Sequence, residues 1–133
     1  MVRTDRPTSG AIAVIDDDEA TRLSLGQMLK LHGYDVDVFA SAEEILFPPR
    51  PVDYDCIVSD VKMPGMDGER FLETMRERTA SPPVIMITGH GDVPMSVRCL
   101  KAGAYDFIEK PFDPEIMLST VARAVEKSRL ERD

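Results

Sequence analysis

Short apolar runs alternate with amphipathic segments along most of this chain. The runs are rich in Val and Ile, which is typical of buried strands, and cover residues 11–15, 36–40, 54–59, 84–87 and 105–108. The intervening segments carry apolar residues three or four positions apart, which predicts helices over residues 19–32, 41–47, 68–78, 92–103 and from 113 onward. The pattern therefore predicts five successive units, each a strand followed by a helix.

Strands that are separated by helices must run parallel, because a parallel neighbour is reached only through a crossover connection. Such crossovers are right-handed and place helices on both faces of the sheet. The expected fold is therefore α/β: a doubly wound five-stranded parallel sheet in the flavodoxin-like order 2-1-3-4-5. In such a sheet, ligands bind outside the carboxyl ends of the strands.

The helices carry expected core positions and expected end signals. We expect the apolar residues to face the sheet, namely Leu23, Met28, Leu29 and Leu31 in the first helix, Val97 and Leu100 in the fourth, and Ile116, Met117, Val121, Ala124 and Val125 in the last. Ser41 and Glu44 have the spacing of a capping box. Asp18, Asp67 and His32 are expected to stabilise helix ends or turns rather than to bind a ligand.

Polar side chains close four of the five predicted strands. Asp16 and Asp17 follow the first strand, Asp60 ends the third, Thr88 closes the fourth and Lys110 follows the fifth. Because the carboxyl ends of parallel strands lie at one edge of a sheet, these side chains are expected to meet. Three carboxylates, a hydroxyl and an ammonium group predict a site for a metal ion and a phosphoryl group.

The composition is that of an ordinary globular domain, with 133 residues, 43% hydrophobic and 30% charged. No apolar run approaches the roughly 18 residues of a membrane span, and the first ten residues lack the apolar core of a secretory signal. A cytoplasmic location without membrane contact is therefore expected. The net charge of −8 argues against direct contact with nucleic acid. Cys56 and Cys99 are expected to be buried small hydrophobic residues rather than a disulfide.

Four segments together carry a resemblance to a known family: 15–19 (IDDDE), 59–64 (SDVKMP), 87–90 (ITGH) and 109–112 (EKPF). They resemble the receiver domain of bacterial two-component response regulators, over nearly all of residues 10–127. The stretches 88–95 and 103–108 are most similar to receivers of dicarboxylate-transport and nitrogen-fixation transcriptional regulators.

The resemblance implies a phosphorylation switch rather than an enzyme acting on a separate substrate. Asp60 would be the phosphoacceptor, taking a phosphoryl group from a sensor histidine kinase. Mg²⁺ would be bound by Asp17, Asp60 and the backbone carbonyl of Lys62, with Asp16 acting through water. This agrees with the chemistry of the residues, because three carboxylates in one crevice need a cation.

The same resemblance assigns roles to the other residues of the site. Thr88 and Lys110 would bind the phosphoryl group, and Phe107 would turn from an exposed to a buried position as Thr88 moves inward. Lys62 and His90 would tune the lifetime of the acyl phosphate. The Lys110–Pro111 peptide bond is expected to be cis. The face formed by the fourth helix, the fifth strand and the fifth helix would control an output, expected to be transcription, and would form a homodimer.

The resemblance also implies a division of the chain: a disordered tail at 1–9, a receiver domain at 10–125, and a helical extension at 126–133 toward an output domain. Whether the chain is a stand-alone receiver or part of a longer regulator stays open. An aspartyl-phosphate hydrolase of the haloacid dehalogenase type is an alternative, with Asp16 as nucleophile, but the chain is short for it. A flavin-binding protein would need a Ser, Thr and Gly-rich phosphate loop where this chain places four acids at 16–19.

Overall fold

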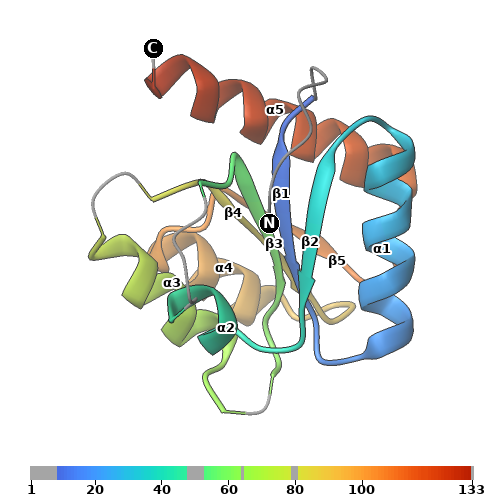
Figure 1. Cartoon of the computed structure of the whole chain (residues 1–133). Helices are drawn as coiled ribbons and strands as arrows, with labels where there is room; N and C mark the ends of the chain where they lie inside the picture. Colours follow the sequence, from blue (N-terminus) through green and yellow to red (C-terminus); the bar gives the residue numbers. More distant parts are fainter. Residues whose placement is uncertain (1–8, 48–52, 64, 79–80, 133) are drawn as a thin grey trace.

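The structure is a computed structural model that describes residues 9–47, 53–63, 65–78 and 81–132. Strands and helices alternate along the chain (Figure 1). The strands are β1 (Ala11–Ile15), β2 (Asp35–Phe39), β3 (Cys56–Asp60), β4 (Val84–Thr88) and β5 (Asp106–Glu109). The helices are α1 (Glu19–Leu31), α2 (Glu43–Leu46), α3 (Gly68–Arg76), α4 (Val93–Ala102) and α5 (Pro114–Arg132).

The five strands form one parallel sheet in the order β2-β1-β3-β4-β5, which confirms the predicted fold. Helices α1 and α5 cover one face, and α2, α3 and α4 cover the other (Figure 1). The register aligns the strand ends: Asp60 pairs with Ile87, and Thr88 pairs with Glu109. The loops that follow β1, β3, β4 and β5 therefore leave the sheet at one edge.

Each face of the sheet has its own hydrophobic core. Successive strand residues point to opposite faces, so Ile12 and Val14 pack under α1 and α5 while Ala13 and Ile15 pack under the other helices. Strands β1, β3 and β4 are buried along their whole length. Burial on both faces explains why these strands read as continuous apolar runs rather than as alternating patterns.

Several of the expected core positions are wrong. Five apolar helix residues are 43% to 78% exposed, namely Leu23, Leu31, Val97, Leu100 and Ile116. The buried residues of α1 are Leu25, Gly26 and the expected Leu29, and those of α4 are Ser96 and Cys99. Gly26, Ser96 and Cys99 are small, and at Gly26 the backbone of α1 comes close to the sheet. A Cβ at Gly26, for example, would lie 2.9 Å from a methyl group of Val38.

The helix ends mostly follow the predicted chemistry. Asp18 and Asp67 cap α1 and α3 by accepting backbone hydrogen bonds, and the ring Nδ1 of His32 lies 3.0 Å from the Met28 carbonyl oxygen. The capping box at α2 is only half formed. Glu44 accepts from the backbone N–H of Ser41, but the N-cap of the helix is Ala42 rather than Ser41, and no side chain caps it.

Helix α5 continues without a break to Arg132, and Ser128 is still buried against the domain. The expected tail at 1–9 lies outside the described residues except for Ser9, whose backbone N–H donates to the Gly33 carbonyl. The boundaries at 10 and 125 stay a prediction. Within the described part of the chain, no helix is both long and apolar enough to cross a bilayer.

Candidate functional site

The polar residues at the strand ends meet at one edge of the sheet, as the sequence predicts. The Lys110 amine lies 3.0 Å from Oδ2 of Asp60 and 3.6 Å from Oδ2 of Asp16. These contacts join the ends of β1, β3 and β5, which are separated by as many as 94 residues in sequence. The Lys110–Pro111 peptide bond is cis, as expected.

Asp16, Asp17 and Asp60 form an acidic cluster. One carboxylate oxygen of each lies within 4.8 Å of the others. Asp16 is fully buried and Asp60 is 9% exposed, whereas Asp17 faces solvent. Burial raises the pKa of the Asp16 carboxyl group, and the nearby Asp60 and Asp17 charges raise it further. Burial alone would lower the pKa of Lys110, but the hydrogen bond and charge of Asp60 outweigh burial and raise it.

Asp16 is held by its own backbone as well as by its side chain. Its N–H donates to the Phe39 carbonyl over 3.1 Å, and Arg22 donates to its carbonyl oxygen over 2.8 Å. Oδ1 accepts from the Asp18 N–H, but Oδ2 is buried without a hydrogen-bond partner. Sequence reasoning missed Arg22, because an arginine in the first turns of a helix has no distinguishing pattern.

The cluster fits a hard divalent cation. Mg²⁺ prefers oxygen ligands and is usually bound through one or two carboxylates together with water. Oδ2 of Asp16 has the Lys110 amine 3.6 Å away but no hydrogen bond, and a buried carboxylate oxygen in that position is stabilised by a metal ion or its bound water. Lys62, whose carbonyl was expected to be a further ligand, lies two residues after the end of β3, and its N–H donates to Oδ1 of Asp60. The residues present therefore fit the expected metal.

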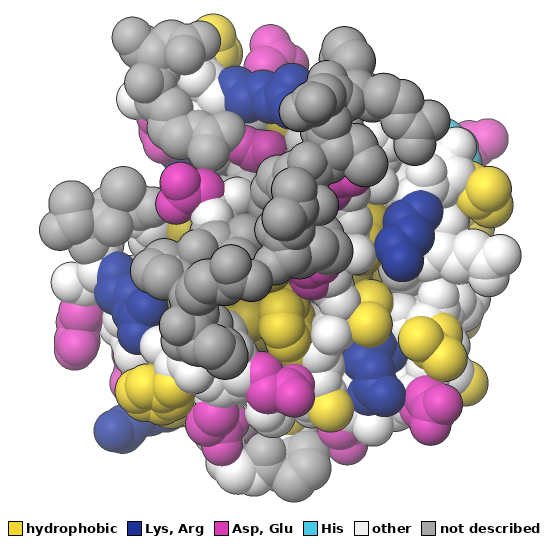
Figure 2. Space-filling view, in the orientation of Figure 1, with side chains coloured by type: hydrophobic (Ala, Val, Ile, Leu, Met, Phe, Trp, Pro, Cys, Tyr) yellow, Lys and Arg dark blue, Asp and Glu magenta, His cyan; other side chains and the backbone are white. Residues whose placement is uncertain are grey.

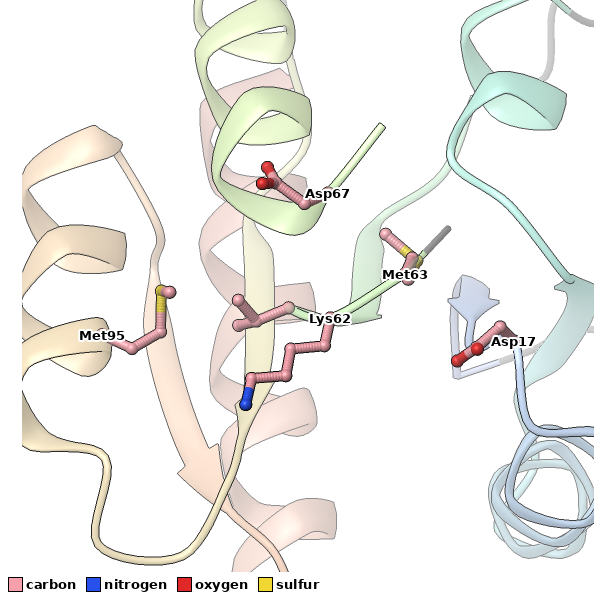
Figure 3. Close-up of a pocket in the computed structure, with 6 residues that line it drawn as sticks. Asp17, Lys62, Met63, Asp67 and Met95 are labelled. Carbon is pink, nitrogen blue, oxygen red and sulfur yellow. The ribbon is translucent and has the colours of Figure 1, made fainter. Parts of the chain in front are cut away.

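A cleft of about 410 Å³ opens beside the cluster. It is lined by Asp17, Val61, Lys62, Met63, Asp67 and Met95. Figure 3 shows the Lys62 side chain extending between Met95 of α4 and Asp17 after β1. The cleft thus gives solvent access to the acidic cluster on the side of Asp17, and Lys62 is part of its lining.

Gly68 allows α3 to begin directly against the end of β3. A Cβ at this position would lie 2.7 Å from the Val61 Cα and 3.0 Å from the Asp60 carbonyl oxygen, closer than any side chain permits. The Gly68 N–H donates to the Val61 carbonyl over 2.7 Å. This close approach holds the start of α3 against the backbone of Asp60 and Val61.

Thr88 is 1% exposed, and its hydroxyl oxygen lies 3.4 Å from that of Ser96 in α4. Phe107 is half-buried rather than exposed as expected, because it packs against the core under α3 and α4. Sequence reasoning missed Ser96, because a serine between two larger apolar residues of a helix reads as solvent-facing.

His90 lies in the loop after β4, where its side chain is exposed and its Nδ1 is 3.7 Å from a carboxylate oxygen of Glu109. The same Glu109 oxygen accepts from the Gly91 N–H over 3.0 Å. The loop after β4 is thereby attached to the end of β5. Glu109 was recognised as part of a motif, but this contact was not foreseen.

Comparison with known proteins gives a consistent result. The response regulator receiver domain matches residues 12–122. The transcriptional regulatory protein FixJ of Bradyrhizobium diazoefficiens is 40% identical over 121 residues, covering 91% of this chain and 59% of FixJ. The C4-dicarboxylate transport transcriptional regulatory protein DctD of Pseudomonas aeruginosa is 43% identical over 119 residues, covering 90% of this chain and 26% of DctD.

The structural comparison agrees. The crystal structure of full-length FixJ from B. japonicum has a TM-score of 0.83 and 40% identity, covering 92% of this chain and 60% of that one. A crystal structure of FixJ-N has a TM-score of 0.80 and 42% identity, covering 87% and 93% of the two chains. The chain spans about three-fifths of the length of FixJ, and the finer resemblance expected from the sequence is confirmed.

The family match favours a receiver over the haloacid dehalogenase-type hydrolase. Flavin-binding proteins share the strand order, so the order gives no reason to prefer them over a receiver. Receiver domains are signalling domains that sensor kinases phosphorylate, and they generally use Mg²⁺ at an acidic pocket like the cluster described above. On the match over residues 12–122 and the shared fold, the chain belongs to the response regulator receiver domain family.

Proposed function

We propose that Asp60 is the phosphoacceptor of this domain and that its modification by a sensor histidine kinase controls an output, expected to be transcription. The observation that carries the proposal is the contact of Lys110 with both Asp60 and Asp16. It brings a cation and two carboxylates to the edge of the sheet where α/β folds bind ligands.

In this proposal an oxygen of the Asp60 carboxylate attacks the phosphorus of a phosphohistidine. A P–O bond forms, the P–N bond breaks, and the imidazole leaves with a proton from solvent. Phosphoryl transfer depends on positioning and on compensation of charge. Lys110, already 3.0 Å from Asp60, would move its hydrogen bond to a phosphoryl oxygen. Mg²⁺, when bound, would neutralise charge on the transferring group.

Asp17, Asp60 and the carbonyl of Lys62 are the proposed metal ligands, with Asp16 acting through water. Asp17 faces solvent, which suits a ligand that exchanges water for a cation, and Asp16 presents a buried oxygen that has no hydrogen-bond partner and only the Lys110 amine 3.6 Å away. The three acids need a metal ion for an electrostatic reason. One positive amine cannot balance three carboxylates within 4.8 Å of one another.

We further propose that Thr88 and Phe107 form the switch. The Thr88 hydroxyl would donate to a phosphoryl oxygen on Asp60, and Phe107 would complete its burial in the space that Thr88 leaves. Phe107 already packs against the core under α3 and α4, so the movement is a repacking of one side chain. The face of α4, β5 and α5 would change shape and form a homodimer.

Lys62 and His90 would set the lifetime of the acyl phosphate by controlling the approach of water. Lys62 lines the cleft beside the acidic cluster, and His90 is exposed on the loop after β4. Replacing both by alanine should change the dephosphorylation rate measured by loss of radiolabel. An unchanged rate would contradict this role.

The proposed regulation does not require this domain to touch nucleic acid. The net charge is −8, and Figure 2 shows Asp and Glu side chains interspersed with Lys and Arg on the face in view. A phosphate backbone is bound by concentrated basic surface. Contact with a promoter would therefore be made by another domain or protein.

The decisive experiment is to locate the acyl phosphate. The domain is treated with acetyl phosphate and Mg²⁺, reduced with borohydride to trap the adduct, and mapped by mass spectrometry. Label on Asp60, lost in Asp60→Asn and retained in the control Asp113→Asn at the start of α5, supports the proposal. Label on Asp16 would instead support a hydrolase-type nucleophile.

A further inference from the structure

Ser96 occupies an unusual place for a polar residue. It is one of two fully buried positions on α4, and its side chain is 3% exposed. A buried hydroxyl needs hydrogen-bond partners, and Ser96 has two: the Asp92 carbonyl oxygen at 3.1 Å and the Thr88 hydroxyl at 3.4 Å. The first contact is ordinary for a helical serine, because it reaches back one turn. The second links α4 to the residue at the end of β4.

The chemistry of these groups fixes the direction of both hydrogen bonds. The Asp92 carbonyl has no proton, so Ser96 must donate its single hydroxyl proton there. Only lone pairs of Ser96 then remain for Thr88, so the Thr88 hydroxyl must be the donor in the contact between them. In the structure described here, the Thr88 proton is therefore directed at α4.

We propose that Ser96 is a positioning residue that holds the Thr88 hydroxyl in its resting orientation. The inference deepens the proposed function, since it rests on the transfer of the Thr88 hydrogen bond to a phosphoryl group. For Thr88 to donate to Asp60 once modified, it must first release Ser96. The bond is long at 3.4 Å, so the restraint is weak and easily reversed. Ser96 thus sets how readily the unmodified domain adopts the switched arrangement.

The test is the affinity for beryllium trifluoride, a non-covalent mimic of a phosphoryl group, titrated in the presence of Mg²⁺ and followed by NMR. Ser96→Ala removes the acceptor of the Thr88 hydroxyl proton. Thr88 then breaks no hydrogen bond to Ser96 when it turns toward the phosphoryl group. Its affinity should rise by about two- to threefold, the lower end of the range for a neutral buried hydrogen bond, because the contact is long. Thr120→Ala removes a buried α5 hydroxyl that back-bonds in the same way and should leave the affinity unchanged.

Repeating the substitution in a Thr88→Val domain distinguishes an effect through Thr88 from a merely structural effect of Ser96. In Thr88→Val, which lacks the hydroxyl, adding Ser96→Ala should not change the affinity further, because the interaction is already absent. An equal gain in both backgrounds, or no gain in either, would overturn the role of Ser96. If the wild-type domain failed to bind beryllium trifluoride, the proposed function itself would fall, and this inference with it.

The orientation of the Thr88 side chain can also be measured directly, first in the unmodified wild-type domain. Three-bond couplings of Thr88 should report a single χ1 rotamer in the free domain and a different rotamer with beryllium trifluoride bound. In Ser96→Ala, the free domain should show couplings averaged between rotamers. Averaged couplings in the free wild-type domain would show that Ser96 does not hold Thr88.

Discussion

Replacing Asp17 by asparagine should make the domain more stable in the absence of divalent cations. Lys110 lies within 4 Å of Asp16 and Asp60, whereas the described residues include no such ion pair for Asp17. The change therefore removes repulsion from the acidic cluster without removing an attraction. Asparagine keeps nearly the same shape as aspartate, so packing in the cluster is preserved.

The size of the effect follows from the geometry. Two unit charges 4.8 Å apart repel by about 0.9 kcal/mol in a water-like medium and about 3.5 kcal/mol at an effective dielectric constant of 20. Asp17 faces solvent, so the lower value applies to each of its two pairs. We expect a gain of about 1 to 2 kcal/mol in the free energy of unfolding.

Mg²⁺ should reduce or reverse the difference in the free energy of unfolding between Asp17→Asn and wild type. A ligand that binds only the folded domain adds about 1.4 kcal/mol at ten times its Kd. Wild type should gain this amount, and Asp17→Asn should gain much less because a proposed ligand is missing. The gap between the two proteins should therefore narrow or invert when Mg²⁺ is added.

The assay is urea denaturation followed by circular dichroism, in EDTA and in Mg²⁺. Glu73→Gln, at an exposed position of α3, is the matched control for removing one negative charge from a chain whose net charge is −8. It should change stability little and respond to Mg²⁺ like wild type. An Asp17→Asn domain less stable than wild type in EDTA, or equally stabilised by Mg²⁺, would refute the reasoning.

Three further outcomes can be measured. Gly68→Ala should lower the free energy of unfolding by about 1 to 3 kcal/mol, because its Cβ meets the backbone after β3. Gly89→Ala has open space around its Cβ and should not lower it. Equal denaturation midpoints for the two variants would contradict this. The buried cysteines, whose thiol pKa values burial raises, should react with Ellman's reagent at pH 8 only after unfolding. Hydrogen bonds from Thr21 hold the pKa of Asp18 below its usual value, so the unfolded state binds more protons than the folded state as the pH falls. Wild type should therefore lose stability relative to Asp18→Asn in this acid range. Urea midpoints measured between pH 5 and 3 would show the loss.

The strand ends and the site could be predicted because they depend on local patterns. A buried apolar run followed by an acid, a hydroxyl or an amine marks the end of a parallel strand. Parallel topology then requires these ends to meet, and the contacts of Lys110 with Asp60 and Asp16 follow from it.

The helix faces were harder to predict, because overlapping sets of residues three and four apart can each form an apolar stripe. In α4, Val97 and Leu100 compete with Ser96 and Cys99 for the packing positions. Hydrophobicity favours the first pair, but the close approach of the helix to β4 requires small side chains. That approach is a property of the assembled sheet, so the sequence alone gives no sign of the contact between Ser96 and Thr88.

The two outer strands carry several charged side chains, whereas the inner strands β1, β3 and β4 carry only Asp60, at the site. β2 places Asp35 and Asp37 along one margin, and β5 begins with Asp106 and ends with Glu109 at the other. An open margin with unpaired backbone groups can recruit strands from other molecules, and charged side chains hinder such recruitment. The apolar segment of β4 is enclosed between neighbours on both sides, so its backbone groups are not open to other molecules. The charged margins thus hinder association through the strand edges, and the proposed homodimer would form through side chains of the α4, β5 and α5 face.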